Sequence, residues 1–489
     1  MPLQSVNIMS DQDNTALTVK HTILPGDLHT PVGLLLRFQD DEGDLFLFES
    51  VVGGANKGRY SVLARCPDRI LEITEDKVTL TDGQAVPLPC HQDGLTALRE
   101  LWAQLPSSLP DDTPPMALGI YGAMAFEAVS LLEPKLLFTP PTPEDVPLGR
   151  FVRPTQILIL DHARDELHVI QLVDPGNRDR ADVALEKILA LLAQPVPAMK
   201  HTDIVPANPT ITSNMTQEQF EQKVIKAQSY IAAGDVFQVV PSQRFSREFH
   251  MGGIALYRAL RTTNPSPYMF YVRNGGREFV GSSPEILVRV SHNHVTLRPI
   301  AGTRPRGKDP MSDELLAKEL QNDPKECAEH LMLLDLGRND VGRVSKIGSV
   351  HVEEEFVIER YSHVMHMVSQ VGGTLDEGYD AIDALLAGLP AGTVSGAPKL
   401  RALEIIAELE PTRRGIYAGG IGYLGLSGNM DTCLVLRTAV VEDGVMHVQA
   451  GAGVVYDSIP QKEYEETVNK ARALFHAADV AEKRFGGLS

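Results

Sequence analysis

Strand-like segments in this 489-residue chain come in clusters and do not alternate one by one with helices. Strand candidates at 279–281, 286–290 and 295–299 follow one another, and helical patterns then occupy 312–322 and 324–336. A parallel, doubly wound sheet needs a crossover helix between successive strands, whereas antiparallel strands can follow each other directly. The pattern therefore predicts an α+β fold whose sheets are mostly antiparallel.

A proline-rich stretch divides the chain into two parts. Residues 194–215 hold four prolines and little periodicity, as expected of an extended connector between regions 1–193 and 216–489. The second region opens with Thr216 and Gln219, which have the spacing of a capping box at the start of a helix. The other candidates are strands at 45–48, 69–73, 156–160, 236–245 and 433–441 and helices at 180–192, 378–386, 399–409 and 461–485.

The composition limits the classes of partner. Forty-five Lys+Arg against 64 Asp+Glu give a net charge of −19, which argues against a nucleic-acid surface and requires a locally positive site for any anionic substrate. Four scattered cysteines form no Cys-x-x-Cys pair and no zinc pattern, so we expect reduced thiols in a cytoplasmic protein. We find neither a signal peptide nor an apolar run of about 18 residues, which predicts no membrane association.

Two pairs of glutamates have the i, i+3 spacing that places side chains on one face of a helix. Glu463 and Glu466 form one pair, with Lys470 four residues further on, and Glu326 and Glu329 form the other. Such spacing alone is more typical of a solvated helix face. The alternative is that both pairs converge on one hard cation, which takes oxygen ligands and leaves room for an anionic substrate.

Three glycine-dense runs, at 390–399, 415–425 and 450–453, allow the backbone to approach a bound group closely or to adopt positive φ. The first two contain Thr393 and Tyr417. Tight turns in a large sheet protein are the alternative explanation. The G-x-G-x-x-G pattern at 420–425 lacks the following helix that a dinucleotide site needs, so we do not predict nucleotide binding. The clustering of the runs favours one site in the last third of the chain.

His363 and His366 lie among apolar neighbours, and Arg437 interrupts a strand-like run. A histidine in such surroundings is either a buried structural residue or a proton carrier near neutral pH. An arginine on a strand either faces solvent or binds a carboxylate through two hydrogen bonds. The residues alone leave both questions open.

Seven motifs, in order, resemble those of the chorismate-utilising enzymes, and they cover residues 215–480. They are FQVV at 237–240, GSSPE at 281–285, PIAGTRPRG at 299–307, EHLMLLDLGRND at 329–340, SHVMH at 362–366, GTVSGAPK at 392–399, and GAG at 451–453 with Glu463-x-x-Glu466-x-x-x-Lys470. Within the family the resemblance is closest to the large (component I) subunits of anthranilate synthases. It implies a large composite of two packed, mostly antiparallel β-sheets flanked by helices, with the chorismate-binding catalytic region at 216–489 and a regulatory or structural region at 1–193.

The resemblance also implies a site. Glu326, Glu329, Glu463 and Glu466 would bind Mg²⁺ next to the ring carboxylate of chorismate. The substrate-binding residues it implies are Gln238, Tyr417, Arg437, Gly451, Ala452, Gly453 and Lys470. The chemistry agrees, because four carboxylates would repel the chorismate dianion unless a divalent cation reversed the local field.

The implied reaction adds ammonia at C2 of chorismate, expels the C4 hydroxyl and then eliminates pyruvate to leave anthranilate, as the first step of tryptophan biosynthesis. Glu285 would be the general acid, and His366, helped by Thr393, would act in pyruvate elimination. Aminodeoxychorismate synthases commonly carry a nucleophilic lysine where this chain has Ala301, and isochorismate synthases carry a lysine base where it has Gln238. Both substitutions favour ammonia as the nucleophile. An aminodeoxychorismate synthase, or a catalytically silent regulatory subunit that responds to tryptophan, is the alternative.

The resemblance implies two further ligands, a partner subunit and an inhibitor. The chain lacks the Gly-x-Cys-x-Gly elbow of a glutamine amidotransferase, so glutamine-derived ammonia would come from a separate small subunit (component II). The segments 47–50 and 264–269 resemble two walls of the family's tryptophan-inhibition pocket, with Phe48 in place of a leucine. The residues that this assigns to tryptophan are Glu49, Ser50, Pro267, Tyr268 and Met269.

Overall fold

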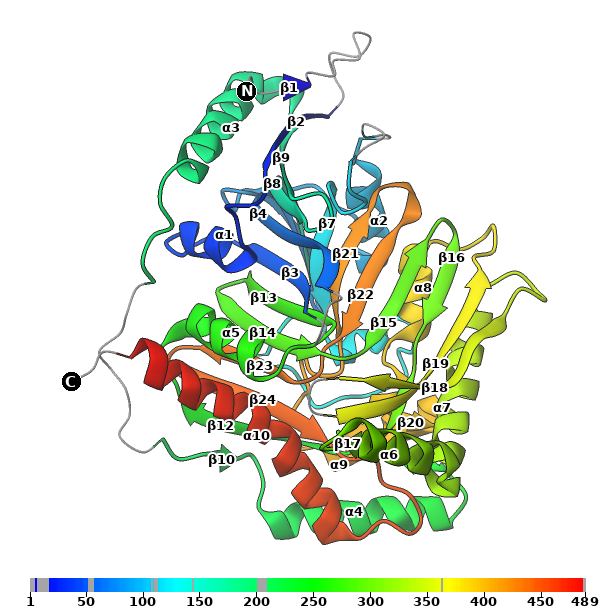
Figure 1. Ribbon diagram of the computed structural model, residues 1–489. Helices are drawn as coiled ribbons and strands as arrows, with labels where there is room; N and C mark the ends of the chain where they lie inside the picture. Colours follow the sequence, from blue (N-terminus) through cyan, green and yellow to red (C-terminus); the bar gives the residue numbers. More distant parts are fainter. Residues whose placement is uncertain are drawn as a thin grey trace.

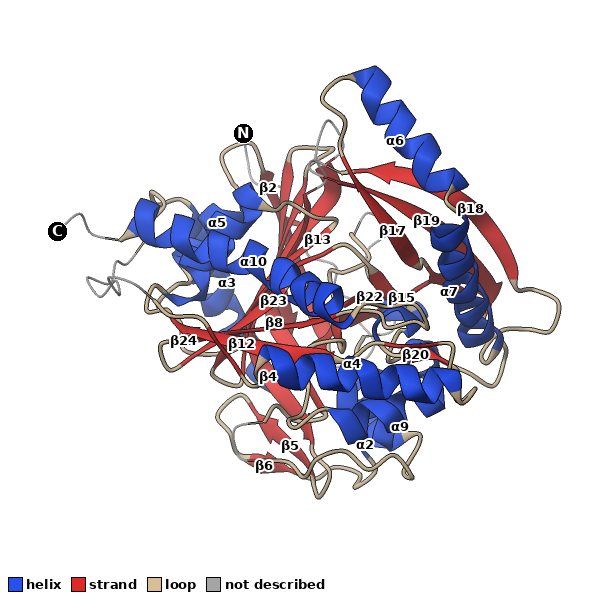
Figure 2. Ribbon diagram, turned by 90° about the horizontal axis from the view of Figure 1, so that it is seen from below, coloured by secondary structure: helices blue, strands red, loops and turns tan. Residues whose placement is uncertain are grey.

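The structure is a computed structural model that describes residues 5–6, 17–51, 57–106, 109, 113–142, 145–199, 209–361 and 364–486. The strands form a large twisted sheet assembly, and most helices lie around its outside (Figures 1 and 2). Every pairing between the named strands is antiparallel. The predicted α+β class with large antiparallel sheets is therefore confirmed.

The strands occur in both regions of the chain. Those of the first region are β1 (Ser5–Val6), β2 (Thr18–Pro25), β3 (Leu45–Val51), β4 (Lys57–Ile73), β5 (Val78–Asp82), β6 (Pro87–Leu88), β7 (Gly119–Met124), β8 (Gly149–Asp161) and β9 (Glu166–Val173). Those that follow are β10 (Thr212–Ser213), β11 (Gln238–Val239), β12 (Ser242–Glu248), β13 (Tyr268–Asn274), β14 (Arg277–Ser283), β15 (Ile286–Ser291), β16 (His294–Leu297), β17 (Ile300–Pro305), β18 (His351–Arg360), β19 (Val364–Thr374), β20 (Gly396–Ala397), β21 (Gly420–Gly425), β22 (Met430–Leu434), β23 (Thr438–Glu442) and β24 (Val445–Gly451).

Several of the helices begin at a Thr or Asp residue whose side chain caps the first turn. The α-helices are α1 (Pro31–Arg37), α2 (Gly94–Ala103), α3 (Arg178–Leu192), α4 (Gln217–Ala232), α5 (Gly252–Thr263), α6 (Pro310–Asn322), α7 (Pro324–Gly342), α8 (Ala381–Gly388), α9 (Lys399–Leu409) and α10 (Pro460–Phe485), and the 3-10 helices are η1 (Phe126–Leu131), η2 (Pro175–Asn177), η3 (Gly392–Val394) and η4 (Leu426–Gly428). The predicted capping box of Thr216 and Gln219 starts α4. Asp323 accepts hydrogen bonds from the first turn of α7 and so fixes the start of the helix that carries Glu326 and Glu329.

Strands from both regions of the chain belong to one hydrogen-bonded network of 22 strands. In the first region β3 pairs with β13 of the second, and Phe48 lies opposite Phe270. Likewise β7 pairs with β21, and Gly122 lies opposite Gly422. The regions on either side of the connector are therefore joined by strand pairing, so the walls of a cavity can come from both.

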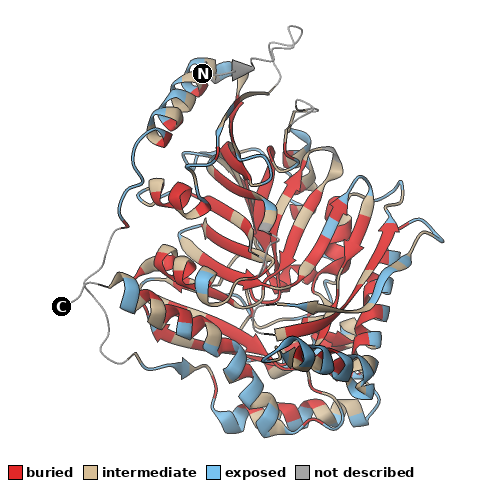
Figure 3. Ribbon diagram, viewed as in Figure 1, coloured by how far each residue is buried: buried red, intermediate tan, exposed pale blue. Residues whose placement is uncertain are grey.

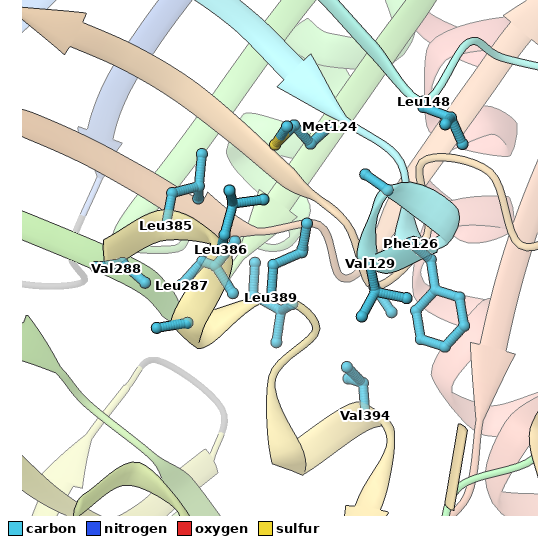
Figure 4. Close-up of a cluster of buried hydrophobic side chains, with 14 of the residues drawn as sticks. Met124, Phe126, Val129, Leu148, Leu287, Val288, Leu385, Leu386, Leu389 and Val394 are labelled. Atoms are coloured by element: carbon cyan, nitrogen blue, oxygen red, sulfur yellow. The ribbon is translucent and has the colours of Figure 1, made fainter. Parts of the chain in front are cut away.

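The core fills the space between the sheet and its covering helices, and buried residues follow the strands and the inner faces of the helices (Figure 3). One apolar cluster joins α8, α9 and η1 to β15, where Leu287 and Val288 lie near Leu385 and Leu386 (Figure 4). A second joins α1, α5 and α10 to strands that include β3, β13 and β24. These packed elements hold the loops between strands and helices in place.

The predicted elements are present, with two changes in the strands. The run predicted as one strand at 433–441 is divided into β22 and β23, because Arg437 has a φ of +46° and a left-handed residue cannot continue the pleat. The run at 236–245 is divided into β11 and β12 around Pro241, which has no N–H for the strand ladder. His363 and part of the connector lie outside the described residues.

None of the helices in the described part of the chain is long and apolar enough to cross a membrane.

Candidate active site

A cavity of about 250 Å³ lies where β11, β17, β19, η3, α7 and α10 meet. Most of the predicted site residues line it. They are Gln238, Glu285, Glu329, His366, Thr393, Tyr417, Arg437, Gly451, Gly453, Glu466 and Lys470. Three predicted residues do not form its wall: Glu326 and Glu463 lie one turn away on their helices, and Ala452 is fully buried beside it.

Glu285 lies between β14 and β15 and is 5 % exposed. Burial raises the pKa of Glu285 to about 8, although the Thr393 hydroxyl, which donates to its Oε1 at 3.0 Å, opposes that rise. Glu285 is therefore mostly protonated at neutral pH and can donate a proton. The prediction grouped Thr393 with His366, whereas the structure places its hydroxyl on Glu285.

His366 is a buried residue of β19. Its Nδ1 lies 3.1 Å from the carbonyl of Gly302 and 3.0 Å from the hydroxyl of Thr303. A carbonyl only accepts, so Nδ1 carries the proton of the neutral ring and Nε2 is the basic nitrogen. Burial and the nearby Arg437 charge lower the pKa of His366 to about 4. The imidazole is therefore neutral near pH 7 and available as a proton acceptor.

Arg437 lies at the break between β22 and β23, where its carbonyl accepts a hydrogen bond from the Ser282 N–H at 3.1 Å. Its guanidinium belongs to the cavity wall, and burial lowers the pKa of Arg437. Among the described residues, no carboxylate forms an ion pair with it. A desolvated cation without a counter-ion is a binding site for an anion.

Another part of the wall of the 250 Å³ cavity is made of β24, the loop after it and β11. A Cβ on Gly451 would lie 2.9 Å from the Tyr417 hydroxyl, and one on Gly453 would lie 2.8 Å from Nε2 of Gln238, so a side chain at either position would displace one of these polar groups. Lys470 Nζ donates to the Gly451 carbonyl at 2.9 Å. The Gln238 amide donates to Glu329 at 3.1 Å, and its Oε1 is buried with no donor among the described residues.

The four predicted metal ligands come from two helices, as the spacing indicated. On α7, Glu326 forms an ion pair with Arg304 at 3.0 Å, and the pKa of Glu329 is raised by burial and by the charges of Glu326 and Glu466. On α10, the pKa of Glu463 is raised by burial and by the charge of Glu466. The glutamates of α7 and α10 therefore lie close enough to repel each other. Glutamates on two separate solvated helix faces would not be brought together in this way.

The sequence profile of chorismate binding enzymes matches residues 54–476. The anthranilate synthase component 1 of Cereibacter sphaeroides is 49 % identical over 471 residues, with 94 % of each chain covered. That of Pseudomonas aeruginosa is 46 % identical over 468 residues, again with 94 % of each covered. The chain belongs to the chorismate-binding enzyme family.

Two solved structures share the fold of this chain. Anthranilate synthase component I from Streptococcus pneumoniae is 36 % identical, superposes with a TM-score of 0.77, and the match covers 92 % of this chain and 98 % of that one. The menaquinone-specific isochorismate synthase MenF from Escherichia coli superposes with a TM-score of 0.72 at 20 % identity and 95 % coverage of each chain, which shows a shared fold alone. Among chorismate-binding enzymes, this chain is thus grouped with the anthranilate synthase component 1 proteins.

The carboxylates of this chorismate-binding enzyme fit a divalent cation by donor type and by charge. Oxygen donors are what Mg²⁺ prefers. Burial and, to a smaller extent, the charges of Glu326 and Glu466 raise the pKa of Glu329, and a bound cation would relieve that repulsion. The site is not closed, however, since no three His, Cys, Asp or Glu side chains of the described residues meet at one point. Lys470 instead pairs with Glu466 at 2.7 Å.

A second cavity, of about 480 Å³, lies between the N-terminal strands and β13, β15, β21 and β22. All five residues predicted for tryptophan line it: Glu49, Ser50, Pro267, Tyr268 and Met269. The Glu49 carboxylate is already held by Arg261 at 2.6 and 2.9 Å and by the Tyr257 hydroxyl. Glu49 therefore contributes to the wall of this cavity without offering it a free charge.

The structure adds two residues to the site, Thr303 and Arg304, to which the sequence analysis assigned no role. Thr303 contacts the ring of His366, and Arg304 binds Glu319, Asp323 and Glu326 at 3.1, 2.8 and 3.0 Å. Both lie in the motif at 299–307, so their place in a family motif could have marked them as site residues. Their partners are distant in sequence or on another element, and only the folded chain identifies them.

Proposed function

We propose that this chain is the synthase subunit of an anthranilate synthase, a lyase that converts chorismate and ammonia into anthranilate and pyruvate. Arg437 is the observation that carries the proposal, because its guanidinium has no counter-ion among the described residues and lines the cavity with protonated Glu285. A dicarboxylate such as chorismate supplies the missing charge. Tyr417 and the backbone at Gly453 would complete the contacts to the enolpyruvyl carboxylate, and Lys470 would face the ring carboxylate.

In the first step ammonia forms a bond to C2 of the ring, the two conjugated ring double bonds each shift by one position, the C4–O bond breaks, and the ammonium group formed at C2 loses one proton. Glu285 gives its proton to the departing hydroxyl, which leaves as water. A positioned acid of this kind contributes about 10²–10⁴-fold to the rate. The unpaired Oε1 of Gln238 is an acceptor suited to an N–H of ammonia, and unlike an amine the Gln238 amide cannot act as a base.

In the second step the proton on C2 is removed and the C3–O bond breaks, so the ring becomes aromatic and the enolpyruvyl group leaves as pyruvate. Neutral His366, with its basic Nε2, is suited to take that proton. Thr303 and the Gly302 carbonyl fix the orientation of the ring. The groups that give and take protons thus lie in one cavity.

Glu329 and Glu466, with Glu326 and Glu463 behind them, would hold Mg²⁺. Once bound, the ion would supply positive charge for the ring carboxylate of chorismate. The glutamates themselves would otherwise repel that carboxylate. Ammonia would come from glutamine through a separate component II amidotransferase, which the name component 1 of the relatives supports.

We further propose that tryptophan binds in the second cavity and inhibits the enzyme. Phe48, Tyr60 and Tyr423 offer it aromatic surface there. The two cavities share Pro284 and Ile300 as lining residues, and Pro284 directly precedes Glu285. An occupant of the second cavity is therefore in a position to displace the catalytic acid.

The test is to incubate the purified chain with chorismate, Mg²⁺ and ammonium salt at high pH and to follow the fluorescence of anthranilate. We expect turnover with ammonium, none with glutamine alone, and loss of turnover with a chelator. Accumulation of aminodeoxychorismate would identify the alternative synthase. Tryptophan binding without any turnover would identify a silent regulatory subunit.

A further inference from the structure

Behind the active-site cavity lies a fully buried ion pair that does not contact the space for substrate. Arg414 and Glu410 are joined through Nε at 2.9 Å and Nη2 at 2.6 Å, and their side chains are 1 % and 5 % exposed. The Glu410 carboxylate also accepts from the N–H and hydroxyl of Ser242 at 2.7 and 2.9 Å. The pair is therefore fully hydrogen-bonded, which a buried pair requires in order to be tolerated.

The rest of the Arg414 guanidinium is bound to backbone carbonyls of the cavity wall. Nη1 donates to the carbonyl of Val394 at 2.8 Å, and Nη2 donates to that of Val240 at 2.6 Å. Val394 directly follows Thr393, whose hydroxyl holds Glu285, and Val240 follows the strand that carries Gln238. The Arg414 side chain thus connects two segments of the cavity wall: the one that carries Thr393 and the one that carries Gln238.

Two aromatic rings and a hydrogen bond from the backbone N–H also hold Arg414 in place. It packs on the rings of Phe126 and Tyr417, at 4.4 and 5.6 Å from their centroids. The N–H of Arg414 itself donates to the buried Glu127 carboxylate at 2.7 Å. Figure 4 shows Phe126 and Val394 in the apolar cluster that encloses this region. The arginine is therefore a rigid support for the wall.

We propose that Arg414 is a positioning residue that holds the Thr393 segment so that the Thr393 hydroxyl stays on Glu285. This inference rests on the proposed function, in which Glu285 is the acid. A lysine could replace the charge of Arg414 but not its planar fork, which reaches two carbonyls and a carboxylate at once. The titratable groups that share the cavity with Glu285 are Glu329, His366, Tyr417, Arg437, Glu466 and Lys470.

The test compares wild type with Arg414→Lys in the ammonium assay, with free ammonia held constant at each pH. We expect kcat to fall about 10- to 100-fold, because a displacement of the order of 1 Å is enough for that loss, while KM for chorismate changes less than about threefold. We also expect the alkaline limb of kcat/KM to move to higher pH. The bond from Thr393 lowers the pKa of Glu285, and its loss lets that pKa rise.

A double-mutant cycle with Thr393→Val identifies the route of the effect. If Arg414 acts through Thr393, adding Arg414→Lys to Thr393→Val should lower kcat by less than about threefold more and leave the limb where Thr393→Val puts it. Effects of the two substitutions that multiply would overturn the proposal. So would an unmoved limb in Arg414→Lys, or a kcat that returns to the wild-type value once it is corrected for the fraction of folded protein. Arg247→Lys is the matched control, since Arg247 is 2 % exposed, pairs with Glu482 at 2.7 Å and lies outside the cavity lining. It should lower stability without moving the limb.

If Arg414→Lys does not fold, the double variant Arg414→Met/Glu410→Gln removes both buried charges together, and such replacements are often tolerated. It should show the same loss in kcat and the same shift of the limb, and wild-type values would refute the proposal. Failure of the proposed function is a separate result. If wild type gives no product, the titration of Glu285, followed as the infrared carboxyl band absent from Glu285→Gln, still shows whether Arg414→Lys raises its pKa.

Discussion

Replacing Glu285 by glutamine should destroy activity and at the same time stabilise the protein at neutral pH. The side chain is 5 % exposed, and its pKa in the folded chain is about 8 against an ordinary 4.5. The amide is close in size and shape to the protonated carboxyl, can accept the bond from Thr393, and cannot give a proton to the leaving hydroxyl. We expect kcat to fall by about 10²–10⁴-fold with chorismate binding little changed.

The stability change follows from proton linkage. A carboxyl whose pKa is raised by folding stabilises the folded state fully below pH 4.5 and progressively less as pH rises toward 8, because the unfolded chain ionises first. Between pH 4 and pH 7 this loss amounts to about 3 kcal/mol, and glutamine does not suffer it. The variant should therefore match wild type near pH 4 and exceed it by about 3 kcal/mol near pH 7.

The assay is urea unfolding at several pH values alongside kcat from anthranilate fluorescence and a chorismate binding titration. Glu100→Gln on the exposed surface of α2 is the control, and it should change neither the pH dependence nor kcat. Equal stability of Glu285→Gln and wild type at pH 7 would show that Glu285 is ionised there and cannot be the acid. Near-wild-type turnover would remove it from the mechanism altogether.

Three further substitutions test the other parts of the site. Ser50→Phe should relieve tryptophan inhibition, because the larger side chain enters the second cavity that Ser50 lines; unchanged inhibition in a dose–response curve would place tryptophan elsewhere. Arg437→Gln should raise KM for chorismate about 10- to 100-fold through loss of a charged contact, as steady-state kinetics would reveal, and an unchanged KM would argue against the carboxylate site. Glu329→Gln should raise the Mg²⁺ concentration needed for half-maximal activity at least about tenfold, and a metal titration with the same midpoint as wild type would exclude Glu329 as a ligand.

The candidate site could be predicted from sequence to the extent that its motifs are local. The spacing of Glu326 with Glu329 and of Glu463 with Glu466 placed each pair correctly on a helix, because α-helical periodicity is a property of the chain itself. Their approach to each other was not readable from spacing, since α7 and α10 are separated by more than a hundred residues. Arg437 was left undecided for the same reason: its left-handed backbone, and its lack of a counter-ion among the residues that the structure describes, depend on its neighbours in the fold.

The sequence by itself determined the class of fold, the positions of the helices and strands, and the family, because hydrophobic period, caps and motif order are all written along the chain. The tertiary structure decided protonation and partners. The pKa of Glu285 is raised because folding buries the carboxyl, and the Thr393 hydroxyl donates to Glu285 because η3 brings it there. Arg414 supports that arrangement through carbonyls, which carry no sequence signal of their own. Desolvation and contact between distant segments exist only in the folded chain, which is why these features could not be predicted.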